Sequence, residues 1–223
     1  VYRFIKNNKS NVPIEEEREV KRFSHEFVNE QWQTDLMYGP YIKYGKKSLQ
    51  TYLVAYIDDC SRLITHAEFY LSQGFEVLRC SFKEAVLKRG IPNSLYTDNG
   101  KIYRSQQFEW MCARLKCLLA HSKPFVPKGR GKIERFFKTV RKRFLSSFDH
   151  REIKNLEDLN LRFFKWLDED YQKKPHSSLN NISPLDKFYS QLSRIIIPDN
   201  PALIKEKFYI TSYRKVNHDA TFT

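Results

Sequence analysis

The chain is poor in cysteine and has no long apolar run. Its four cysteines form no Cys-x-x-Cys pair and lie in apolar or mixed segments, at Cys60, Cys80, Cys112 and Cys117. This pattern is typical of reduced core thiols in a cytosolic protein. No stretch approaches the roughly 18 apolar residues of a membrane span, and no secretory signal opens the chain. These absences predict a cytoplasmic protein with no membrane partner.

Histidines in metal-ligand spacing are also missing. The chain has six, His25, His66, His121, His150, His176 and His218. None of their separations matches those of zinc ligands, which excludes a zinc site built on histidine and cysteine.

What the chain has in excess is positive charge. Its 223 residues carry 39 Lys and Arg against 26 Asp and Glu, a net charge of +13 with a pI near 9.5. An extended polyanion is one partner that fits this balance, and a merely soluble basic protein is the other interpretation. The 41% apolar and 15% aromatic content fits one good-sized domain with a smaller appendage.

Periodicity predicts a mixed α/β fold for residues 28–150. Three strands joined by short turns, at 31–44, 49–57 and 63–71, predict an antiparallel meander. Two further strands, at 94–97 and 118–121, follow helices that begin after Gly74 and Ser105, which predicts a parallel extension of the sheet. We therefore expect five strands with helices packed on them.

The flanking segments carry weaker signals. Residues 1–27 are polar and charged and predict a linker or short helix, whereas residues 151–197 predict a helical extension with a helix capped by Asn155. Residues 198–223 predict a linker and then a strand at 207–216 that starts a small, truncated β domain. Because the chain begins with Val1 and ends within this unit, we expect an excised fragment of a longer protein.

Three carboxylates stand out when they are considered together. Asp35 lies inside the first strand, Asp98 directly follows the strand at 94–97, and Glu134 follows Asp98 with 35 residues between them. Singly, Asp98-Asn99-Gly100 is a good turn sequence and Glu134 with Lys138 is an ordinary helical pair. Together, three converging carboxylates would repel one another unless they share a divalent metal, and oxygen ligands favour Mg²⁺ or Mn²⁺.

Five motifs, in order, resemble the integrase catalytic core of bacterial insertion-sequence transposases, in the retroviral integrase superfamily. They are Trp32-Gln33-Thr34-Asp35, Ile57-Asp58-Asp59-Cys60-Ser61-Arg62, Thr97-Asp98-Asn99-Gly100, Pro127-Lys128-Gly129-Arg130-Gly131-Lys132-Ile133-Glu134-Arg135-Phe136, and Pro175-His176-Ser177-Ser178-Leu179 with Ser183-Pro184. The resemblance covers roughly residues 28–190. It implies a ribonuclease-H-like fold and a D,D-35-E active site, with Asp35, Asp98 and Glu134 as catalytic metal ligands.

The resemblance also implies a reaction. A DNA transposase or integrase of this kind uses two metal ions for in-line attack by water at the element end and then by the freed 3′-hydroxyl on target DNA. It implies a homo-oligomer assembled on DNA, and hence nucleoid association in a bacterial cytoplasm. The alternatives are a nuclease of the same fold without strand transfer and a catalytically silent DNA-binding protein. A recombinase with a tyrosine nucleophile is disfavoured, because no Arg and His constellation accompanies the 13 tyrosines.

A basic segment surrounds Glu134. Residues 123–151 hold ten Lys or Arg and two acids, which is +8 of the total charge. Basic residues at the positions of Lys138 and Arg141 contact the DNA end in the family. Further candidate DNA contacts are Lys128, Arg130, Lys132 and Lys142, and a solvated basic face is the alternative. Gly129 and Gly131 predict that the lead into Glu134 becomes ordered only with DNA.

Two other sites have non-catalytic interpretations. Asp58 and Asp59 end a strand and predict a turn with an Asp59–Arg62 contact rather than a metal site. His176 either packs structurally or touches DNA. The His-His-Cys-Cys unit of retroviral integrases and the upstream helix-turn-helix expected in such transposases are absent, so we expect this fragment to bind DNA mainly non-specifically.

Overall fold

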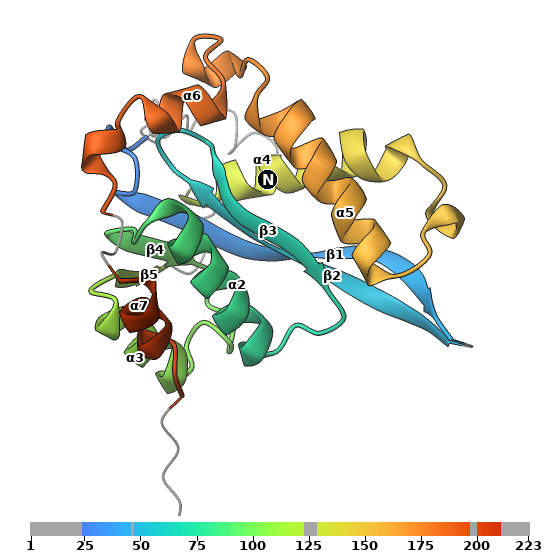
Figure 1. The fold of residues 1–223 in the computed structure, drawn as a ribbon, viewed down its shortest axis with the longest axis horizontal. Coiled ribbons are helices and arrows are strands. Elements are labelled where there is room, and N and C mark those ends of the chain that lie inside the picture. The colour runs from blue at the N-terminus through green and yellow to red at the C-terminus, as the bar shows by residue number, and fades with distance from the viewer. Residues whose placement is uncertain (1–23, 46, 123–128, 197–199, 211–223) are drawn as a thin grey trace, which may run out of the picture.

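A five-stranded mixed sheet forms the centre of the molecule (Figure 1). The computed structural model describes residues 24–45, 47–122, 129–196 and 200–210. The strand order is β3-β2-β1-β4-β5. The bounds are β1 Gln31–Tyr44, β2 Lys47–Asp58, β3 Ile64–Tyr70, β4 Ser94–Thr97 and β5 Leu118–His121. The first three strands are antiparallel, and β4 and β5 run parallel to β1. The predicted meander with a parallel extension is confirmed.

One face of the sheet is covered by α2 (Phe75–Arg89), α3 (Gln106–Arg114) and α7 (Pro201–Lys207). Trp32 and Tyr56 point from the sheet toward Phe82 of α2, whose ring stacks on Tyr56 at 5.5 Å between centroids. Phe108 of α3 packs on the Phe82 ring as well. The helices between the parallel strands therefore bury their apolar stripes on this face, as the period of the sequence predicts.

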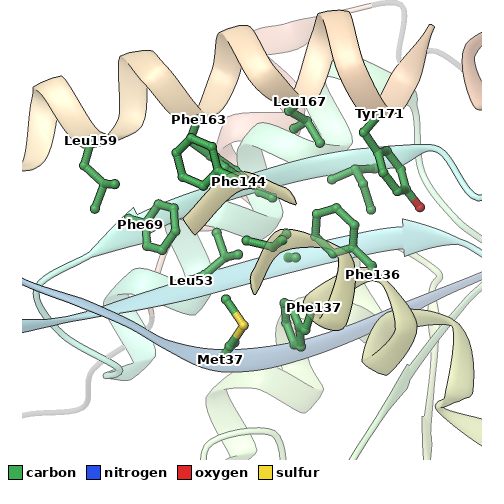
Figure 2. Packing of buried hydrophobic residues seen from close by; sticks show 14 of the residues in the cluster. Met37, Leu53, Phe69, Phe136, Phe137, Phe144, Leu159, Phe163, Leu167 and Tyr171 are labelled. Carbon is green, nitrogen blue, oxygen red and sulfur yellow. The ribbon is translucent and has the colours of Figure 1, made fainter. Parts of the chain in front are cut away.

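The opposite face is covered by α4 and α5. Helix α4 (Gly131–Thr139) continues as a π-helical turn, η2 (Val140–Phe144), and then a 3-10 turn, η3 (Leu145–Ser147). Helix α5 (Leu156–Trp166) continues as a second π-helical turn, η5 (Leu167–Gln172). Figure 2 shows Phe163 of α5 and Phe144 of η2 packed against each other and close to Phe69 of β3. Each is nearly inaccessible to solvent, so this aromatic layer fixes α4 and α5 on the sheet.

Two amides of the α5 region complete the outer edge of the sheet. Asn160 accepts a hydrogen bond from the backbone N–H of Phe69 and donates one to its carbonyl, at 2.8 and 2.9 Å. Gln172 bonds the N–H and carbonyl of Ile64 in the same way. Because β3 is the edge strand, these side chains take the place of a neighbouring strand and block further pairing.

The remaining elements are short. They are η4 (His150–Glu152), η6 (Ser177–Leu179), α6 (Pro184–Tyr189) and η7 (Leu192–Arg194). The predicted Asn155 cap is confirmed, since its side chain accepts from the Asp158 N–H at 2.8 Å, and Ser183 caps α6 in the same way. Among the described residues, no helix has both the length and the hydropathy needed to cross a membrane.

The C-terminal prediction was wrong in part. Where a linker and then a strand from residue 207 were expected, the chain forms α7, capped by the Asn200 side chain with Pro201 in the first turn. Ile204 and Phe208, four residues apart, are buried against the α2 and α3 layer. That burial favours a helix over the alternating strand. The rest of the predicted strand, 211–216, and residues 1–23 of the linker or helix predicted for 1–27 lie outside the described residues.

Candidate active site

The three carboxylates singled out in the sequence come from three elements and converge at one edge of the sheet. Asp35 lies in the middle of β1, Asp98 directly follows β4, and Glu134 lies in the first turn of α4. β4 pairs with β1 only as far as Gln33, so Asp35 lies on the open edge beside Asp98. Helix α4 packs across β1 and brings Glu134 to the same place.

A guanidinium joins these three carboxylates. Arg130 Nη1 lies 3.5 Å from Asp35 Oδ2 and 3.4 Å from Asp98 Oδ2, and its Nη2 lies 3.5 Å from Glu134 Oε1. All four side chains are close in space although 98 residues lie between Asp35 and Glu134 in the sequence. One cation therefore lies where three anionic groups meet.

The fit of this cation is incomplete. Nη1 of Arg130 is buried and makes no hydrogen bond, although two carboxylates lie within ion-pair distance. A buried donor without a partner is costly, and planar guanidinium geometry does not match three converging carboxylates. Burial raises the pKa of Asp35, and the Asp98 and Glu134 charges raise it further, against the Leu36 N–H bond and Arg130, which lower it. The cluster therefore has more negative charge than one arginine compensates.

The Asp98 turn is held rigidly against β5. Asp98 Oδ1 accepts the Gly100 N–H at 2.8 Å, and the Asn99 amide donates to the Ser122 carbonyl at 2.7 Å. His121 Nδ1 lies 3.1 Å from the Asp98 carbonyl oxygen. The Asp-Asn-Gly segment is thus both the turn expected from its composition and the support of a site carboxylate.

A buried polar chain fixes the start of α4. The Gln33 side chain accepts the Ile133 N–H at 3.3 Å and donates to Asp59 Oδ1 at 2.9 Å. Lys132 forms an ion pair with Asp59 and also donates to its backbone carbonyl. Burial lowers the pKa of Lys132, and the Asp59 carboxylate acts in the opposite direction. These contacts of Lys132 and Ile133 fix the first turn of α4, which contains Glu134.

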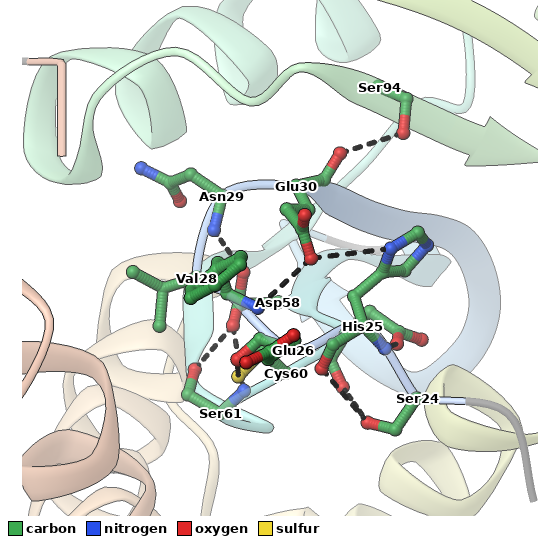
Figure 3. A network of polar contacts seen from close by, with 12 residues as sticks. Ser24, His25, Glu26, Val28, Asn29, Glu30, Asp58, Cys60, Ser61 and Ser94 are labelled. Atoms are coloured by element: carbon green, nitrogen blue, oxygen red, sulfur yellow. Dashed lines mark hydrogen bonds and ion pairs between the residues drawn. The ribbon is translucent and has the colours of Figure 1, made fainter. Parts of the chain in front are cut away.

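Asp58 and Asp59 have different roles. Figure 3 shows the Asp58 carboxylate between Asn29 and Ser61, where it accepts both backbone N–H groups at 2.8 Å and the Ser61 hydroxyl at 2.6 Å. The turn role predicted for Asp58 is confirmed. Asp59 forms its ion pair with Lys132. Arg62 donates hydrogen bonds to the Cys60 carbonyl and to Ser24, and the Asp59 charge acts on it by raising its pKa, so the predicted Asp59–Arg62 interaction is electrostatic and not a direct hydrogen bond.

The three carboxylates are suitable ligands for a metal ion, but their observed spacing is too wide for all three to bind one ion. Within the described ranges, no three His, Cys, Asp or Glu side chains come together closely enough to hold a metal ion as they stand. Here the guanidinium lies between the three acids. The three carboxylates offer only oxygen ligands, which suit a hard divalent cation. The guanidinium fits them less well, since its Nη1 makes no hydrogen bond.

The predicted DNA contacts have different surroundings. Lys138, Arg141 and Lys142 are exposed along α4 and η2, on the side away from the core. Lys132 is largely buried in its ion pair with Asp59, and Lys128 lies outside the described residues. Arg130 is held by the carboxylates. His176 Nδ1 accepts the Ser178 N–H at 3.3 Å, and its ring packs edge-on against Tyr171, which agrees with the packing interpretation and leaves a DNA contact as a prediction.

One residue of the site, Gln33, was not predicted from the sequence, and Gly129 has a role beyond the predicted one. Gln33, two positions before Asp35, shares its face of β1, a spacing that could have pointed to it. Gly129 approaches the Tyr96 ring so closely that a side chain at this position would overlap with the phenol. A glycine at this position therefore permits the close approach, whereas the predicted mobility of this segment stays a prediction.

A pocket of about 220 Å³ opens beside the carboxylates. Asp35 and Asp98 lie at its lining, and its apolar part is formed by Leu36, Val54 and Tyr103 among others. The charged part of the site thus borders a cavity with a partly apolar lining.

Comparison with known proteins gives a consistent picture. Two family models described as Integrase core domain match residues 25–127 and 115–184. The chain is similar to the transposase for transposon Tn552 of Staphylococcus aureus, 31% identical over 219 residues, covering 86% of this chain and 44% of that protein. It is also similar to the intracisternal A-particle Pol-related polyprotein of mouse intracisternal a-particle MIA14, 32% identical over 110 residues, covering 49% and 12%. The chain spans less than half the length of both relatives.

Solved structures that superimpose on the chain include an intasome and an integrase catalytic core. A simian T-cell lymphotropic virus intasome in complex with PP2A regulatory subunit B56 gamma superimposes with a TM-score of 0.61 at 19% identity, over 86% of this chain and 63% of that chain. The HTLV-2 integrase catalytic core in complex with magnesium gives a TM-score of 0.56 at 19% identity, over 73% and 97%. These similarities confirm the predicted ribonuclease-H-like fold.

Proposed function

The chain belongs to the integrase core domain family of transposases and integrases, and from this we propose that it is the catalytic core of a DNA transposase. Its substrates are the ends of a mobile element and target DNA, and it acts in a bacterial cytoplasm on nucleoid DNA. The observation that supports this proposal most directly is that Asp35, Asp98 and Glu134 come together around the guanidinium of one arginine.

In the proposed reaction, water attacks a phosphodiester at the element end, and the released 3′-hydroxyl then attacks a target phosphodiester. Each step forms one phosphorus–oxygen bond and breaks one. Asp35, Asp98 and Glu134 would hold Mg²⁺ or Mn²⁺, two ions in the active complex, which would lower the pKa of the attacking oxygen and neutralise the leaving oxygen. No covalent enzyme intermediate is required.

The basic residues of this region would position the DNA. Once freed from the carboxylates, the Arg130 guanidinium can offer two parallel donors to a phosphate. Lys138, Arg141 and Lys142, exposed along α4 and η2, would contact the backbone of the element end. Lys128 and Lys132 are further proposed phosphate contacts. For Lys132 this requires release from Asp59, to which it is paired here.

The decisive experiment offers precut, labelled element-end oligonucleotides and target DNA to the full-length protein with Mg²⁺. Wild type should give products longer than the labelled strand, and Asp98→Asn should give none. Asp168→Asn, an exposed acid in η5, is the matched control and should retain joining. If Asp98→Asn joins ends as well as wild type, the site assignment is wrong.

The same gel separates the proposal from its closest alternative. A nuclease of the same fold would shorten the labelled strand and yield no longer product. Binding of Mn²⁺ gives a second readout that does not depend on catalysis, since the ion should raise the unfolding temperature of wild type but not that of Asp98→Asn.

Assembly on DNA is part of the proposal. The matched simian virus structure is an intasome, and the HTLV-2 core is described as dimeric. For this chain we expect a monomer or weak oligomer alone and a defined multimer on element-end DNA. Light scattering with and without that DNA measures the change in mass.

A further inference from the structure

The hairpin of β1 and β2 extends beyond the rest of the sheet. β3 pairs with β2 only from Tyr52 onward, and β4 pairs with β1 only from Gln31 to Gln33. In the described residues, the outer part of the hairpin is therefore a two-stranded arm, which projects past the helices in Figure 1. A two-stranded arm has little stability of its own and gains stability when another surface packs on it.

A bulge at Gly39 and Pro40 changes which side chains face outward. Tyr38 pairs with Tyr52, but Tyr41 pairs with Gln50, so β1 has one extra residue at this point. Residues 38 and 41, an odd number apart, consequently point to the same face instead of opposite faces. Without the bulge, Tyr41 would point toward the α4 and α5 side.

The bulge is a built feature. The Thr51 hydroxyl donates to the Pro40 carbonyl at 2.6 Å, and the Gln50 amide donates to the Gly39 carbonyl at 2.5 Å. A side chain at Gly39 would lie 2.7 Å from the ring of Phe69. Specific hydrogen bonds and a required glycine thus stabilise the register that aligns the two tyrosines.

The resulting face is aromatic and positive. Tyr38 and Tyr41 are each 62% exposed, and the Tyr38 ring contacts that of Tyr52 at 5.4 Å between centroids. The exposed Lys43 lies on the same face. Between Asp35 and Asp58 the sequence has three lysines and no acid. Exposed rings with unbalanced positive charge favour an anionic ligand that has flat apolar surfaces.

The face leads to the pocket that Asp35 and Asp98 also line, although the Asp35 side chain itself leaves the opposite face of β1. The aromatic face continues along the strands to Leu36 and Val54, which line the pocket beside Asp35 and Asp98. Tyr38 is three residues from Asp35, about 10 Å along an extended strand. A ligand that follows the rings would therefore reach the reacting edge of the sheet.

We propose that the face formed by Tyr38, Tyr41, Tyr52 and Lys43 binds unpaired bases of a DNA strand next to the active site. Bases in a duplex have their flat faces covered by neighbours, whereas a frayed or displaced strand exposes them to stacking. A second copy of the chain is disfavoured as the occupant, because the lysines of two such arms would repel each other. The inference rests on the proposed function for its setting, but the binding itself requires neither metal nor catalysis.

The test measures anisotropy of a fluorescent 12-nucleotide oligo-dT with the full chain in EDTA. Tyr38→Ala/Tyr41→Ala should weaken binding at least about tenfold, since stacking contributes roughly five- to a hundredfold per base. Tyr38→Phe/Tyr41→Phe should bind within about twofold of wild type, because the ring is retained. Tyr209→Ala removes an equally exposed tyrosine elsewhere, 64% accessible, and should have no effect.

Several outcomes would overturn the proposal. The first is that the double alanine variant binds oligo-dT as tightly as wild type. The second is that the double phenylalanine variant loses as much affinity as the alanine variant. The third is that the alanine variant loses as much affinity for a hairpin-free duplex of the same length as for oligo-dT. A loss of self-association without a change in DNA affinity would also overturn it, in favour of a second copy. Circular dichroism confirms folding of each variant. Failure of strand transfer with intact oligo-dT binding would reject only the proposed function.

Discussion

Arg130 is the residue that connects the three carboxylates of the site. Its guanidinium is within 3.5 Å of all three, yet Nη1 has no hydrogen bond. A single positive charge opposes three negative charges, so the site has residual affinity for cations. Arg130 and a divalent ion are therefore expected to compete for the same oxygens.

Replacing Arg130 should thus strengthen metal binding. In Arg130→Gln we expect Mn²⁺ to bind severalfold more tightly, because a competing cation is lost, although partial exposure limits the effect. Isothermal titration calorimetry measures this affinity. Arg135→Gln, which removes an exposed charge one residue after Glu134, is the control. Equal gains in both variants would show that only net charge matters.

His66 makes stability depend on pH. Burial lowers its pKa, while Glu68 within 3.3 Å raises it and Lys88 lowers it. In the unfolded chain the histidine binds a proton near pH 6.5, which the folded chain resists. The stability contribution is present above that pH and is lost as the pH falls below it.

We therefore expect the unfolding free energy of wild type to fall between about pH 7.5 and pH 5.5. In His66→Gln this slope should be smaller, since glutamine does not titrate. Urea unfolding at several pH values measures the slope. His150→Gln, at an exposed histidine, should retain the wild-type slope. An unchanged slope in His66→Gln would contradict the assignment.

At the scale of elements, α4 is positioned by contacts of the residues that precede Glu134 in its first turn. Lys132 and Gln33 connect its first turn to the buried Asp59 at the end of β2. Removing one partner of such a pair leaves a buried charge uncompensated, which is costly. The orientation of Glu134 is thus linked to the core of the sheet.

Lys132→Met should lower the unfolding free energy by about 1–3 kcal/mol. It should also reduce the rise in unfolding temperature caused by Mn²⁺, because Glu134 is less well oriented. Differential scanning calorimetry with and without Mn²⁺ measures both quantities. Lys138→Met, the same change at an exposed position of α4, should affect neither. Equal losses in the two variants would exclude the Asp59 contact as the cause.

The capping of the β3 edge by α5 can be tested in the same way. Asn160→Leu removes both hydrogen bonds to Phe69 and should destabilise the protein by about 2–4 kcal/mol. It should also increase aggregation, since the edge strand is then free to pair. Chemical unfolding and light scattering measure these effects. Lys165→Leu, on the exposed side of α5, should change stability little.

For the whole molecule, charge should dominate DNA affinity. With a net charge of +13, non-specific binding is expected to weaken steeply as salt rises. Replacing Lys138, Arg141 and Lys142 together by alanine should reduce the slope of log K against log salt by roughly 2.7, since each phosphate contact contributes about 0.9. Fluorescence titrations with duplex DNA at several salt concentrations measure the slope.

A matched control removes the same charge elsewhere. Lys154, Lys165 and Lys205 are exposed in other elements, and their replacement by alanine should leave the slope nearly unchanged. Similar slopes for the two triple variants would show that the basic residues after Glu134 form a solvated face rather than a DNA contact.

Local signals account for what could be predicted about the fold. The change of period after Gly74, the caps at Asn155 and Ser183, and the strand before Asp98 are each encoded within a few residues. Helix α7 escaped prediction because its helical form depends on burial of Ile204 and Phe208 against α2 and α3, which lie far earlier in the sequence. A local pattern does not specify that contact.

By itself the sequence determined the five strands, their order along the chain, and the three carboxylates with the basic segment around Glu134. Only the tertiary structure decided their partners: Arg130 between the acids, Asp59 with Lys132, and Tyr41 turned to the side of Tyr38. Periodicity and capping act between neighbours in the chain, and so they can be read from it. Partners across the fold depend on strand register, and one extra residue at Gly39 is enough to reverse the face on which a side chain lies.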